Sequence, residues 1–242
     1  MKLSNLLFSI LCILLISSCQ SDPEISFESS STEEFRPLYH FTPESGWMND
    51  PNGLIFLDGE YHLFYQHYPD GTVWGPMHWG HAVSTDLVNW ESLPIALYPD
   101  SLGYIFSGSA VLDAENSSGL GSAENPPMVA IFTYHNAEEA NTTSETFQNQ
   151  AIAFSLDKGR TWEKYEGNPV LPNPGIRDFR DPKVSQITNA DGTKSWIMTL
   201  AVLDHINFYS SPDLKSWTLL SEFGKTIGAH GGVWECPDLL PF

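Results

Sequence analysis

The pattern of the heptapeptide Ser84-Thr85-Asp86-Leu87-Val88-Asn89-Trp90 recurs twice further along the chain, once with an additional residue before the tryptophan. Each copy consists of Ser-x-Asp, a turn and then Trp, and the copies are about 55 to 70 residues apart, a spacing that suits four short strands with their loops. The pattern therefore predicts the blades of a β-propeller, with the aspartate capping each turn and the tryptophan packing between blades. None of these aspartates is expected to be catalytic. The other two copies are Ser155-Leu156-Asp157-Lys158-Gly159-Arg160-Thr161-Trp162 and Ser211-Pro212-Asp213-Leu214-Lys215-Ser216-Trp217.

Short apolar runs separated by turn residues surround these repeats. They have strand length and are rich in aromatic and β-branched residues. No long stretch has helical periodicity, so the sequence predicts an all-β fold. Examples are residues 61–65, 128–132, 151–154 and 196–200.

A further stretch, Trp47-Met48-Asn49-Asp50-Pro51-Asn52-Gly53, places one carboxylate between two amides and before a proline. The proline is expected to hold Asp50 in an extended conformation, and Asn52-Gly53 predicts a sharp turn. The run 54–57 that follows is typical of a buried strand. Asp50 is thus a candidate catalytic carboxylate on a braced loop; the alternative is an ordinary Asx turn before a strand.

Two more carboxylate motifs occur downstream, Arg180-Asp181-Pro182 and Glu235-Cys236-Pro237. Together with the Asp50 motif they resemble, in order, the three signature motifs of glycoside hydrolase family 32, the invertases, levanases and inulinases that cleave β-fructofuranosidic bonds. Several ordered motifs make a more specific signal than one short match. The resemblance runs from about Tyr39 to the last residue and also includes residues 64–66, 73–75, 78–84 and 106–109.

The resemblance implies a five-bladed β-propeller followed by a β-sandwich. Residues 36–242 are expected to form a partial propeller, with about the first three to four blades and without the sandwich. An open ring leaves strand edges and aromatic faces exposed. Residues 20–242 alone are therefore expected to fold poorly and to be inactive.

The resemblance also implies the roles of the three carboxylates. Retaining glycosidases need a nucleophile and an acid/base on opposite sides of the scissile bond. Asp50 would be the nucleophile, with Asn49 and the turn amides donating hydrogen bonds to it. Glu235 would be the acid/base, in apolar surroundings that favour its protonated form; the alternative is a solvated edge residue. Asp181 would bind fructose hydroxyls and stabilise the transition state.

Further residues match positions that contact substrate in the family. Arg180 would orient Asp181, whereas Arg177 and Asp178, which lack a following proline, are expected to form a surface pair. Without the resemblance, Trp74 and Phe106 would be assigned to the core. The predicted substrate-binding residues are Trp47, Asn49, Gln66, Trp74, Phe106, Ser107 and Arg180.

Composition narrows the choice of partner. The chain has 242 residues and a formal net charge of −19, with 30 acidic residues against 11 basic ones. Such a balance argues against nucleic acid or an anionic membrane surface and is compatible with a neutral sugar. No cofactor is expected. His78 and His81 lack a nearby third ligand, so we expect no metal site and interpret both as structural.

The N-terminus predicts export. Residues 1–19 have a short basic start, an apolar stretch and the sequence Ile16-Ser17-Ser18-Cys19, which resembles a bacterial lipoprotein cleavage box. Cys19 would carry the lipid; the alternative is an ordinary signal peptide with a chance cysteine. Residues 20–35 are rich in Ser and Glu and are typical of a disordered tether. Cys236 would then be the only other cysteine of the mature chain, so no disulfide is expected.

The sequence as a whole predicts a secreted, lipid-anchored β-fructofuranosidase that acts on levan, inulin or sucrose with retention of configuration. Two alternatives stay open. One is another five-bladed glycosidase, such as an arabinan hydrolase, against which residues 47–53 argue. The other is a surface glycan-binding lipoprotein that has lost catalysis, against which the three intact carboxylates argue.

Overall fold

The computed structural model describes residues 33–37 and 40–240. The chain divides into two units, residues 1–40 and 41–242, and all the described strands belong to the second. The predicted leader, including Cys19, and nearly all of the predicted tether lie outside the described residues. In the part that is described, no helix is both long and apolar enough to cross a membrane.

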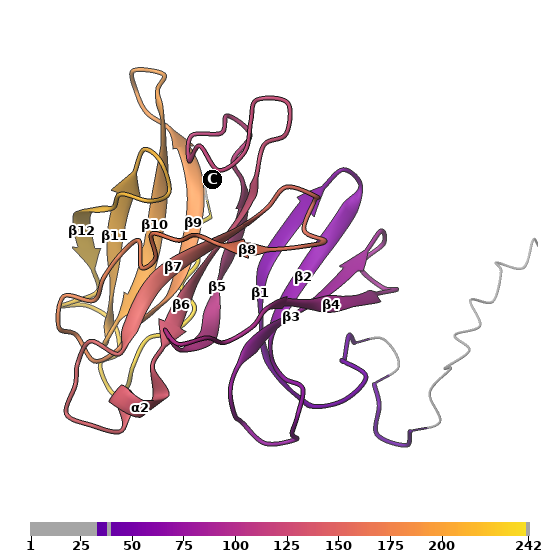
Figure 1. Cartoon of the computed structure of the whole chain (residues 1–242). Coiled ribbons are helices and arrows are strands. Elements are labelled where there is room, and N and C mark those ends of the chain that lie inside the picture. The colour runs from indigo at the N-terminus through magenta and orange to yellow at the C-terminus, as the bar shows by residue number, and fades with distance from the viewer. Residues whose placement is uncertain (1–32, 38–39, 241–242) are drawn as a thin grey trace, which may run out of the picture. The chain divides into compact units, whose positions relative to one another are not determined.

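The second unit is built from three four-stranded antiparallel sheets, each with its strands in sequence order (Figure 1). A four-residue helix, α2 (Ala137–Ala140), interrupts the connection between β6 and β7. The all-β prediction is confirmed. The sheets are β1 (Trp47–Leu57), β2 (Glu60–Tyr68), β3 (His78–Ser84) and β4 (Glu91–Leu97); β5 (Tyr104–Leu112), β6 (Met128–His135), β7 (Gln148–Ser155) and β8 (Glu163–Lys164); and β9 (Phe179–Thr188), β10 (Lys194–Val202), β11 (His205–Ser211) and β12 (Thr218–Phe223).

Each sequence repeat forms the turn between the third and fourth strands of one sheet. In the first copy, Asp86 Oδ1 accepts hydrogen bonds from the backbone amides of Val88 and Asn89. Asp213 accepts from two backbone amides in the same way, and Asp157 accepts from the amide of Thr161. The prediction that the aspartate caps the turn is therefore confirmed.

The tryptophans of the repeats follow the predicted pattern in two of three copies. Trp162 meets Phe64 of the preceding sheet edge-on, with ring centroids 5.5 Å apart. Trp217 packs against the core between the second and third sheets. Trp90 instead contacts Phe41, at 6.0 Å between centroids; its sheet is the first, so no described sheet precedes it.

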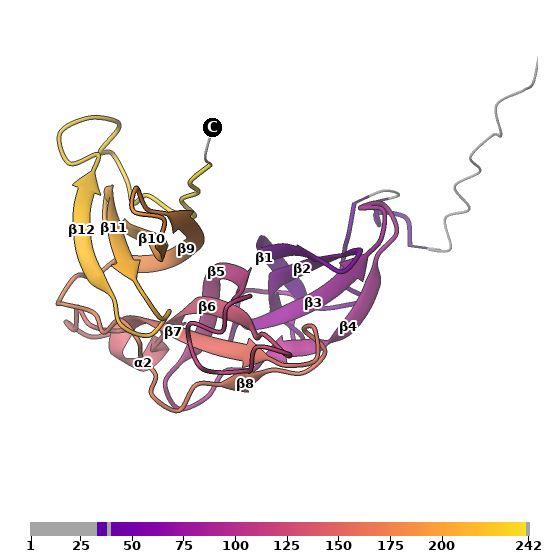
Figure 2. The ribbon, with the colours of Figure 1, turned by 90° about the horizontal axis from the view of Figure 1, so that it is seen from above.

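Successive sheets pack face to face, which is the arrangement of propeller blades (Figure 2). Because successive side chains of a strand point to opposite faces, the central strand β6 serves both interfaces. Ala130 and Phe132 join the core shared with the first sheet, whereas Val129 and Ile131 join the core shared with the third. The described residues thus form three blades, as the repeat predicts.

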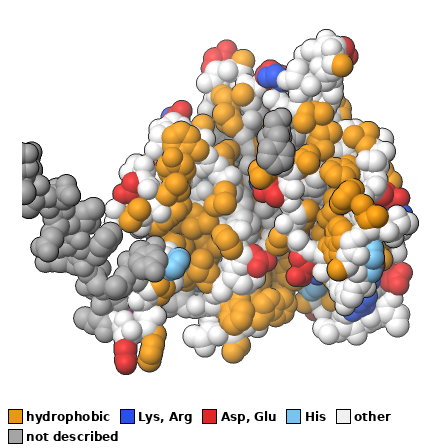
Figure 3. Space-filling model, turned by 180° about the vertical axis from the view of Figure 1, so that it is seen from behind, with side chains coloured by type: hydrophobic (Ala, Val, Ile, Leu, Met, Phe, Trp, Pro, Cys, Tyr) orange, Lys and Arg blue, Asp and Glu red, His pale blue; other side chains and the backbone are white. Residues whose placement is uncertain are grey.

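The run 54–57 is a strand, but the prediction that it is buried is wrong. Leu54 and Phe56 are 60% and 58% exposed, and only Ile55 and Leu57 pack against the core. The reason is the alternation of the strand, since one face of β1 has no sheet against it among the described residues. β12 is exposed along its length. Figure 3 shows apolar side chains reaching the surface over wide areas of one face.

Candidate active site

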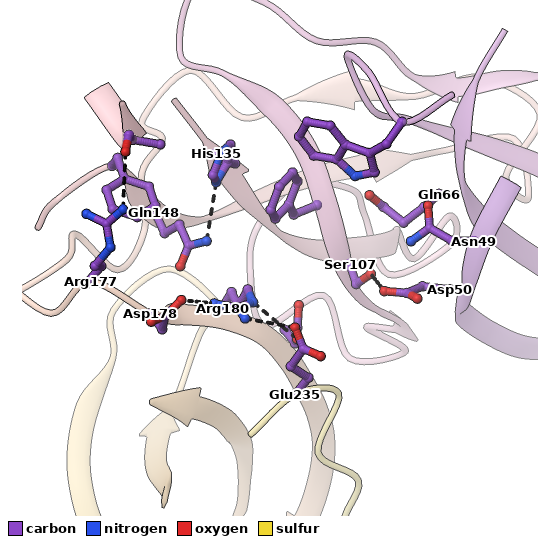
Figure 4. Close-up of a pocket in the computed structure, with 15 residues that line it drawn as sticks. Asn49, Asp50, Gln66, Ser107, His135, Gln148, Arg177, Asp178, Arg180 and Glu235 are labelled. Atoms are coloured by element: carbon purple, nitrogen blue, oxygen red, sulfur yellow. Dashed lines mark hydrogen bonds and ion pairs between the residues drawn. The ribbon is translucent and has the colours of Figure 1, made fainter. Parts of the chain in front are cut away.

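The first strands of the three sheets, β1, β5 and β9, lie next to one another and line a cavity of about 360 Å³ (Figure 4). The segment after β12 closes part of it through Glu235. Residues from all parts of the second unit therefore meet here. The lining residues are Asn49, Asp50, Gln66, Trp74, Phe106, Ser107, His135, Ala140, Phe147, Gln148, Arg177, Asp178, Arg180, Asp181 and Glu235.

The same irregularity occurs in each of these three strands. The pairing register of β1 skips Asp50, that of β5 skips Ser107, and that of β9 skips Asp181 with the proline after it. A bulge leaves a residue unpaired, bends the strand and redirects a side chain. Each sheet therefore contributes one bulge residue to the site; Asp50 and Asp181 line the cavity beside Ser107.

Asp50 does not adopt the extended conformation predicted from the following proline. Its φ is +21°, and Asp181, also followed by proline, has φ of +63°. Positive φ is uncommon for residues other than glycine, and aspartate tolerates it better than most. The bulge geometry overrides the local preference set by proline, at a cost that the surrounding sheets must offset.

Asp50 is held by a neighbour from the next sheet. Ser107 Oγ donates a hydrogen bond of 3.0 Å to Asp50 Oδ2. Among the described residues, Asn49 donates no hydrogen bond to Asp50 as the sequence predicted; its Oδ1 accepts from Trp47 Nε1 at 2.7 Å. Trp47 is not among the lining residues, and its indole holds the side chain of Asn49.

Asp181 is the most enclosed of the three carboxylates, at 7% exposure. Its Oδ2 accepts from the backbone amide of Cys236 at 3.1 Å, and Arg180 Nε lies 3.9 Å away. Burial raises the pKa of Asp181, and the negative charges of Glu235 and Asp50 add to this, while the Cys236 amide and Arg180 oppose it.

Arg180 links two carboxylates across the site. Its guanidinium contacts Asp178 Oδ1 at 2.5 Å and Glu235 Oε1 at 2.8 Å. The prediction that Arg177 and Asp178 form a surface pair is therefore wrong: both line the cavity, and Asp178 pairs with Arg180 instead. The sequence places Asp178 and Arg180 two residues apart at the start of a strand, which puts both side chains on one face.

Glu235 reaches the site from the segment that follows β12. The Trp234 amide donates to Leu203 O at 2.7 Å, and the Trp234 ring lies against Gly224 and Gly228, where any Cβ would clash with it. The apolar surroundings predicted for Glu235 are not found, since its side chain is 63% exposed and pairs with Arg180. The residues beside Glu235 in the sequence do not reveal its ion-pair partner, because Arg180 lies on β9.

Cys236 is a site residue that the sequence reasoning missed. Its Sγ lies 3.7 Å from Asp181 Oδ2 and 4.0 Å from Asp50 Oδ2, so the thiol sits between two carboxylates. Burial and the charges of Asp181, Asp50 and Glu235 raise the pKa of the thiol to about 12. The feature of the sequence that could have identified Cys236 as a site residue is its position between Glu235 and Pro237.

The predicted sugar-binding residues line the cavity, apart from Trp47. Gln66 is 3% exposed, and its Nε2 has no hydrogen-bond partner among the described residues. Trp74 is 49% exposed and meets Phe106 edge-on at 6.1 Å, so neither ring is simply core.

His135, Phe147 and Gln148 also line the cavity and had no recognisable motif in the sequence. His81, in contrast, is buried and bonds to His62 at 3.1 Å, in keeping with its structural interpretation.

Known proteins are similar to this chain in sequence and in the arrangement of their sheets. The chain is 55% identical over 235 residues to a levanase of Bacillus subtilis (strain 168), covering 97% of this chain and 32% of that protein. It is 42% identical over 235 residues to an extracellular exo-inulinase of Aspergillus awamori, covering 89% and 43%. The chain thus spans about a third of the length of the levanase and less than half of the length of the exo-inulinase.

Solved structures agree with the sequence relatives. The crystal structure of exo-inulinase from Aspergillus awamori superposes with a TM-score of 0.71 at 43% identity, over 82% of this chain and 41% of that chain. The fructofuranosidase from Schwanniomyces occidentalis complexed with fructose gives 0.73 at 42%, over 84% and 39%. Residues 40–242 match the description "Glycosyl hydrolases family 32 N-terminal domain". Because that match contains all three blades and all three carboxylate motifs, the chain belongs to glycosyl hydrolase family 32.

Proposed function

We propose that the protein hydrolyses β-fructofuranosidic bonds in levan, inulin or sucrose, with retention of configuration and without a cofactor. The observation that carries this proposal is the convergence of Asp50, Asp181 and Glu235 on one cavity. The relatives are a levanase, exo-inulinases and an invertase, which supports a fructoside as substrate.

Asp50 is the nucleophile of the proposed reaction. A carboxylate oxygen attacks the anomeric carbon of the fructosyl unit as the bond to the leaving oxygen breaks, giving a fructosyl-enzyme ester. The hydrogen bond from Ser107 fixes the orientation of the carboxylate. Asp50 Oδ2 accepts from Ser107, so Oδ1 is the oxygen that we assign to attack.

Glu235 is the acid/base. It gives a proton to the leaving oxygen in the first step and takes one from the attacking water in the second, which releases fructose and restores Asp50. Arg180, at 2.8 Å, holds Glu235 at the cavity. Its 63% exposed side chain leaves room for water to enter.

Asp181 binds sugar hydroxyls rather than attacking carbon. The Cys236 amide holds Asp181 Oδ2, and no described residue donates a hydrogen bond to Oδ1, which can accept from substrate. Hydrogen bonds to a carboxylate are stronger than those between neutral groups. Gln66 Nε2, buried and unpartnered, is a donor for a ring hydroxyl. Trp74 and Phe106 exclude water and offer apolar faces to the furanose.

Parallel assays on sucrose, levan and inulin test this function in the full-length protein. Release of reducing sugar together with sizing of the products identifies the substrate and the mode of cleavage. Proton NMR of the first-formed product reports retention, because β-fructofuranose appears before it equilibrates. Binding of levan without release of fructose would favour the glycan-binding alternative, and cleavage of arabinan alone would favour the arabinan hydrolase.

We further propose that the protein is exported and anchored by acyl chains on Cys19. The support is the sequence of residues 1–19 and the extracellular exo-inulinases among the relatives. The mature protein should partition into detergent, and Cys19→Ala should release it or block its processing. A mature N-terminus beyond Cys19 without lipid would refute this.

A further inference from the structure

One wall of the cavity has no role in the chemistry proposed above. It lies across from Asp50, Asn49 and Gln66 in Figure 4, on the same side as Arg180, which pairs with Glu235. His135 and Gln148 form it together with Phe147, and all three line the cavity. Gln148 accepts a hydrogen bond from Phe179, the residue before Arg180, and Arg180 holds Glu235 at 2.8 Å. The wall is therefore next to the segment that holds the proposed acid/base, the group that protonates the leaving oxygen.

Gln148 has a defined amide orientation. Its side chain is 2% exposed, and its Oε1 accepts from the backbone amide of Phe179 at 2.9 Å. An amide nitrogen could not accept that bond, so Nε2 is the atom directed at His135 Nδ1, 3.3 Å away. Nε2 can only donate. His135 Nδ1 is therefore the acceptor and carries no proton.

The protonation state of His135 follows from this bond. When one ring nitrogen accepts, the proton of the neutral imidazole is on the other. Burial lowers the pKa of His135 to about 4, and the charge of Arg180 adds to this, so the ring is neutral above that pH. Its Nε2–H is then a donor, and no hydrogen bond joins it to another described residue.

The ring is also held in place. Phe106 stacks on it with a centroid distance of 4.1 Å and an interplanar angle of 6°, and Phe147 meets it edge-on at 5.4 Å. The guanidinium of Arg177 lies over the Phe147 ring, 5.1 Å from its centroid. Fixed rings with one directed donor are what a sugar subsite requires, because apolar faces stack on the ring and the donor selects a hydroxyl.

We propose that this wall is the subsite for the leaving-group sugar, and that His135 Nε2–H donates a hydrogen bond to one of its hydroxyls. Gln148 acts as a positioning residue that keeps the proton on Nε2. This inference rests on the proposed function. It makes His135 a determinant of which fructosides are cleaved well, since a leaving group without a second hydroxyl cannot use the bond.

A comparison of two substrates tests the proposal in the full-length protein. Sucrose has a sugar as its leaving group, whereas methyl β-D-fructofuranoside releases methanol, which also needs protonation but has no further hydroxyl. His135→Phe keeps a ring to stack on Phe106 and removes the donor. We expect kcat/KM for sucrose to fall about tenfold, the loss expected for one net hydrogen bond, while kcat/KM for the methyl fructoside changes less than about twofold.

Two further variants separate recognition from folding. His135→Gln places an amide nitrogen near the position of Nε2 and should restore part of the activity on sucrose. Gln148→Glu presents a carboxylate oxygen to Nδ1, which should move the proton to Nδ1 and reduce activity on sucrose as His135→Phe does. The ¹⁵N shifts of selectively labelled histidine report the tautomer directly. Gln186→Glu, the same change at an exposed position on β9, should alter neither activity.

The outcomes are distinct. Equal losses on both substrates in His135→Phe would show that the residue is structural or contacts the fructosyl unit, and would overturn the inference. An unchanged kcat/KM for sucrose would overturn it as well. If the wild-type protein cleaves neither fructoside, the proposed function fails and this inference fails with it.

Discussion

Ser107 Oγ donates to Asp50 Oδ2 at 3.0 Å, and the two residues occupy the same bulge position in the first strands of adjacent sheets. Asp181 holds that position in the third sheet. In the segment after β12, Cys236 has φ of +47° and precedes a proline, as Asp50 and Asp181 do. The site is therefore a set of related backbone irregularities that carry two aspartates, a serine and a cysteine.

This arrangement explains why the side chains meet. The first strand of each blade contacts that of the next, so the bulge residues converge at the cavity and at the Cys236 thiol. The bulge in β5, for example, places Ser107 where it can donate a hydrogen bond to Asp50 of the adjacent sheet.

The first prediction concerns the proposed catalytic carboxylates. Asp50→Asn should lower kcat on sucrose at least about 10⁴-fold, because an amide cannot form the ester. Glu235→Gln should lower it about 10²- to 10⁴-fold, and least for substrates with good leaving groups, which need little protonation. Asp191→Asn, in an exposed turn, is the matched control. Near-normal activity of Asp50→Asn would contradict the assignment.

The second prediction contrasts two serines of β5. Ser107→Ala removes the bond to Asp50 and should lower kcat about tenfold with little change in stability. Ser109 instead joins β5 to β9: its Oγ donates to Pro182 O at 3.0 Å and accepts from the Val184 amide at 2.9 Å. Ser109→Ala leaves buried groups unpaired and should cost about 1 to 3 kcal/mol of unfolding free energy.

Steady-state kinetics and denaturant unfolding of the two serine variants measure these effects. The comparison fails if Ser107→Ala loses as much stability as Ser109→Ala, because both serines would then act in folding. It also fails if Ser107→Ala keeps full activity, since the bond to Asp50 would then have no part in the reaction.

The third prediction concerns the reactivity of Cys236. The thiol is free and the residue is exposed, yet burial of its sulfur and three nearby carboxylates raise its pKa to about 12. Only the thiolate reacts with alkylating agents, and at pH 8 its fraction would be about 10⁻⁴. Iodoacetamide should therefore modify Cys236 at least about a thousandfold more slowly than it modifies a cysteine peptide.

Mass spectrometry of the alkylated protein follows this reaction. Asp50→Asn and Asp181→Asn each remove one of the negative charges, so either variant should speed the modification. A wild-type rate equal to that of the peptide would mean that the carboxylates do not hold the proton on the thiol.

The fourth prediction concerns stability in acid. Burial lowers the pKa values of His62, His81 and His135, to about 3 for His81 and about 4 for His135. An unfolded histidine titrates near 6.5. Between about pH 6.5 and 4, the unfolded chain therefore binds protons that the folded chain does not, and the free energy of unfolding should fall as the pH is lowered.

Each such histidine contributes up to about 1.4 kcal/mol per pH unit in that window. Denaturant unfolding from pH 7.5 to 4.5 measures the slope, and His81→Asn should reduce it. Asp157 and Asp213 act in another window: their pKa values are lowered, so their contribution is present above about pH 4 and is lost only below it. A flat profile between pH 6.5 and 4.5 would rule out the buried neutral histidines.

The sequence by itself determined the blades and the identity of the carboxylates. The Ser-x-Asp-turn-Trp repeat could be interpreted because its hydrogen bonds join residues two to four positions apart, as between Asp86 and Asn89 or Ser155 and Gly159. Such bonds form wherever the local chain can make them. Asp50, Asp181 and Glu235 were found by their motifs, and family membership made their convergence an expectation.

Only the tertiary structure decided how those carboxylates are held. The positive φ of Asp50 comes from a bulge against β2, which outweighs the preference that Pro51 sets locally. The ion pair of Glu235 with Arg180 and the tautomer of His135, set by Gln148, join residues that are far apart in sequence. These features depend on strand register and on the packing of one sheet on the next, and no short stretch of sequence contains both partners.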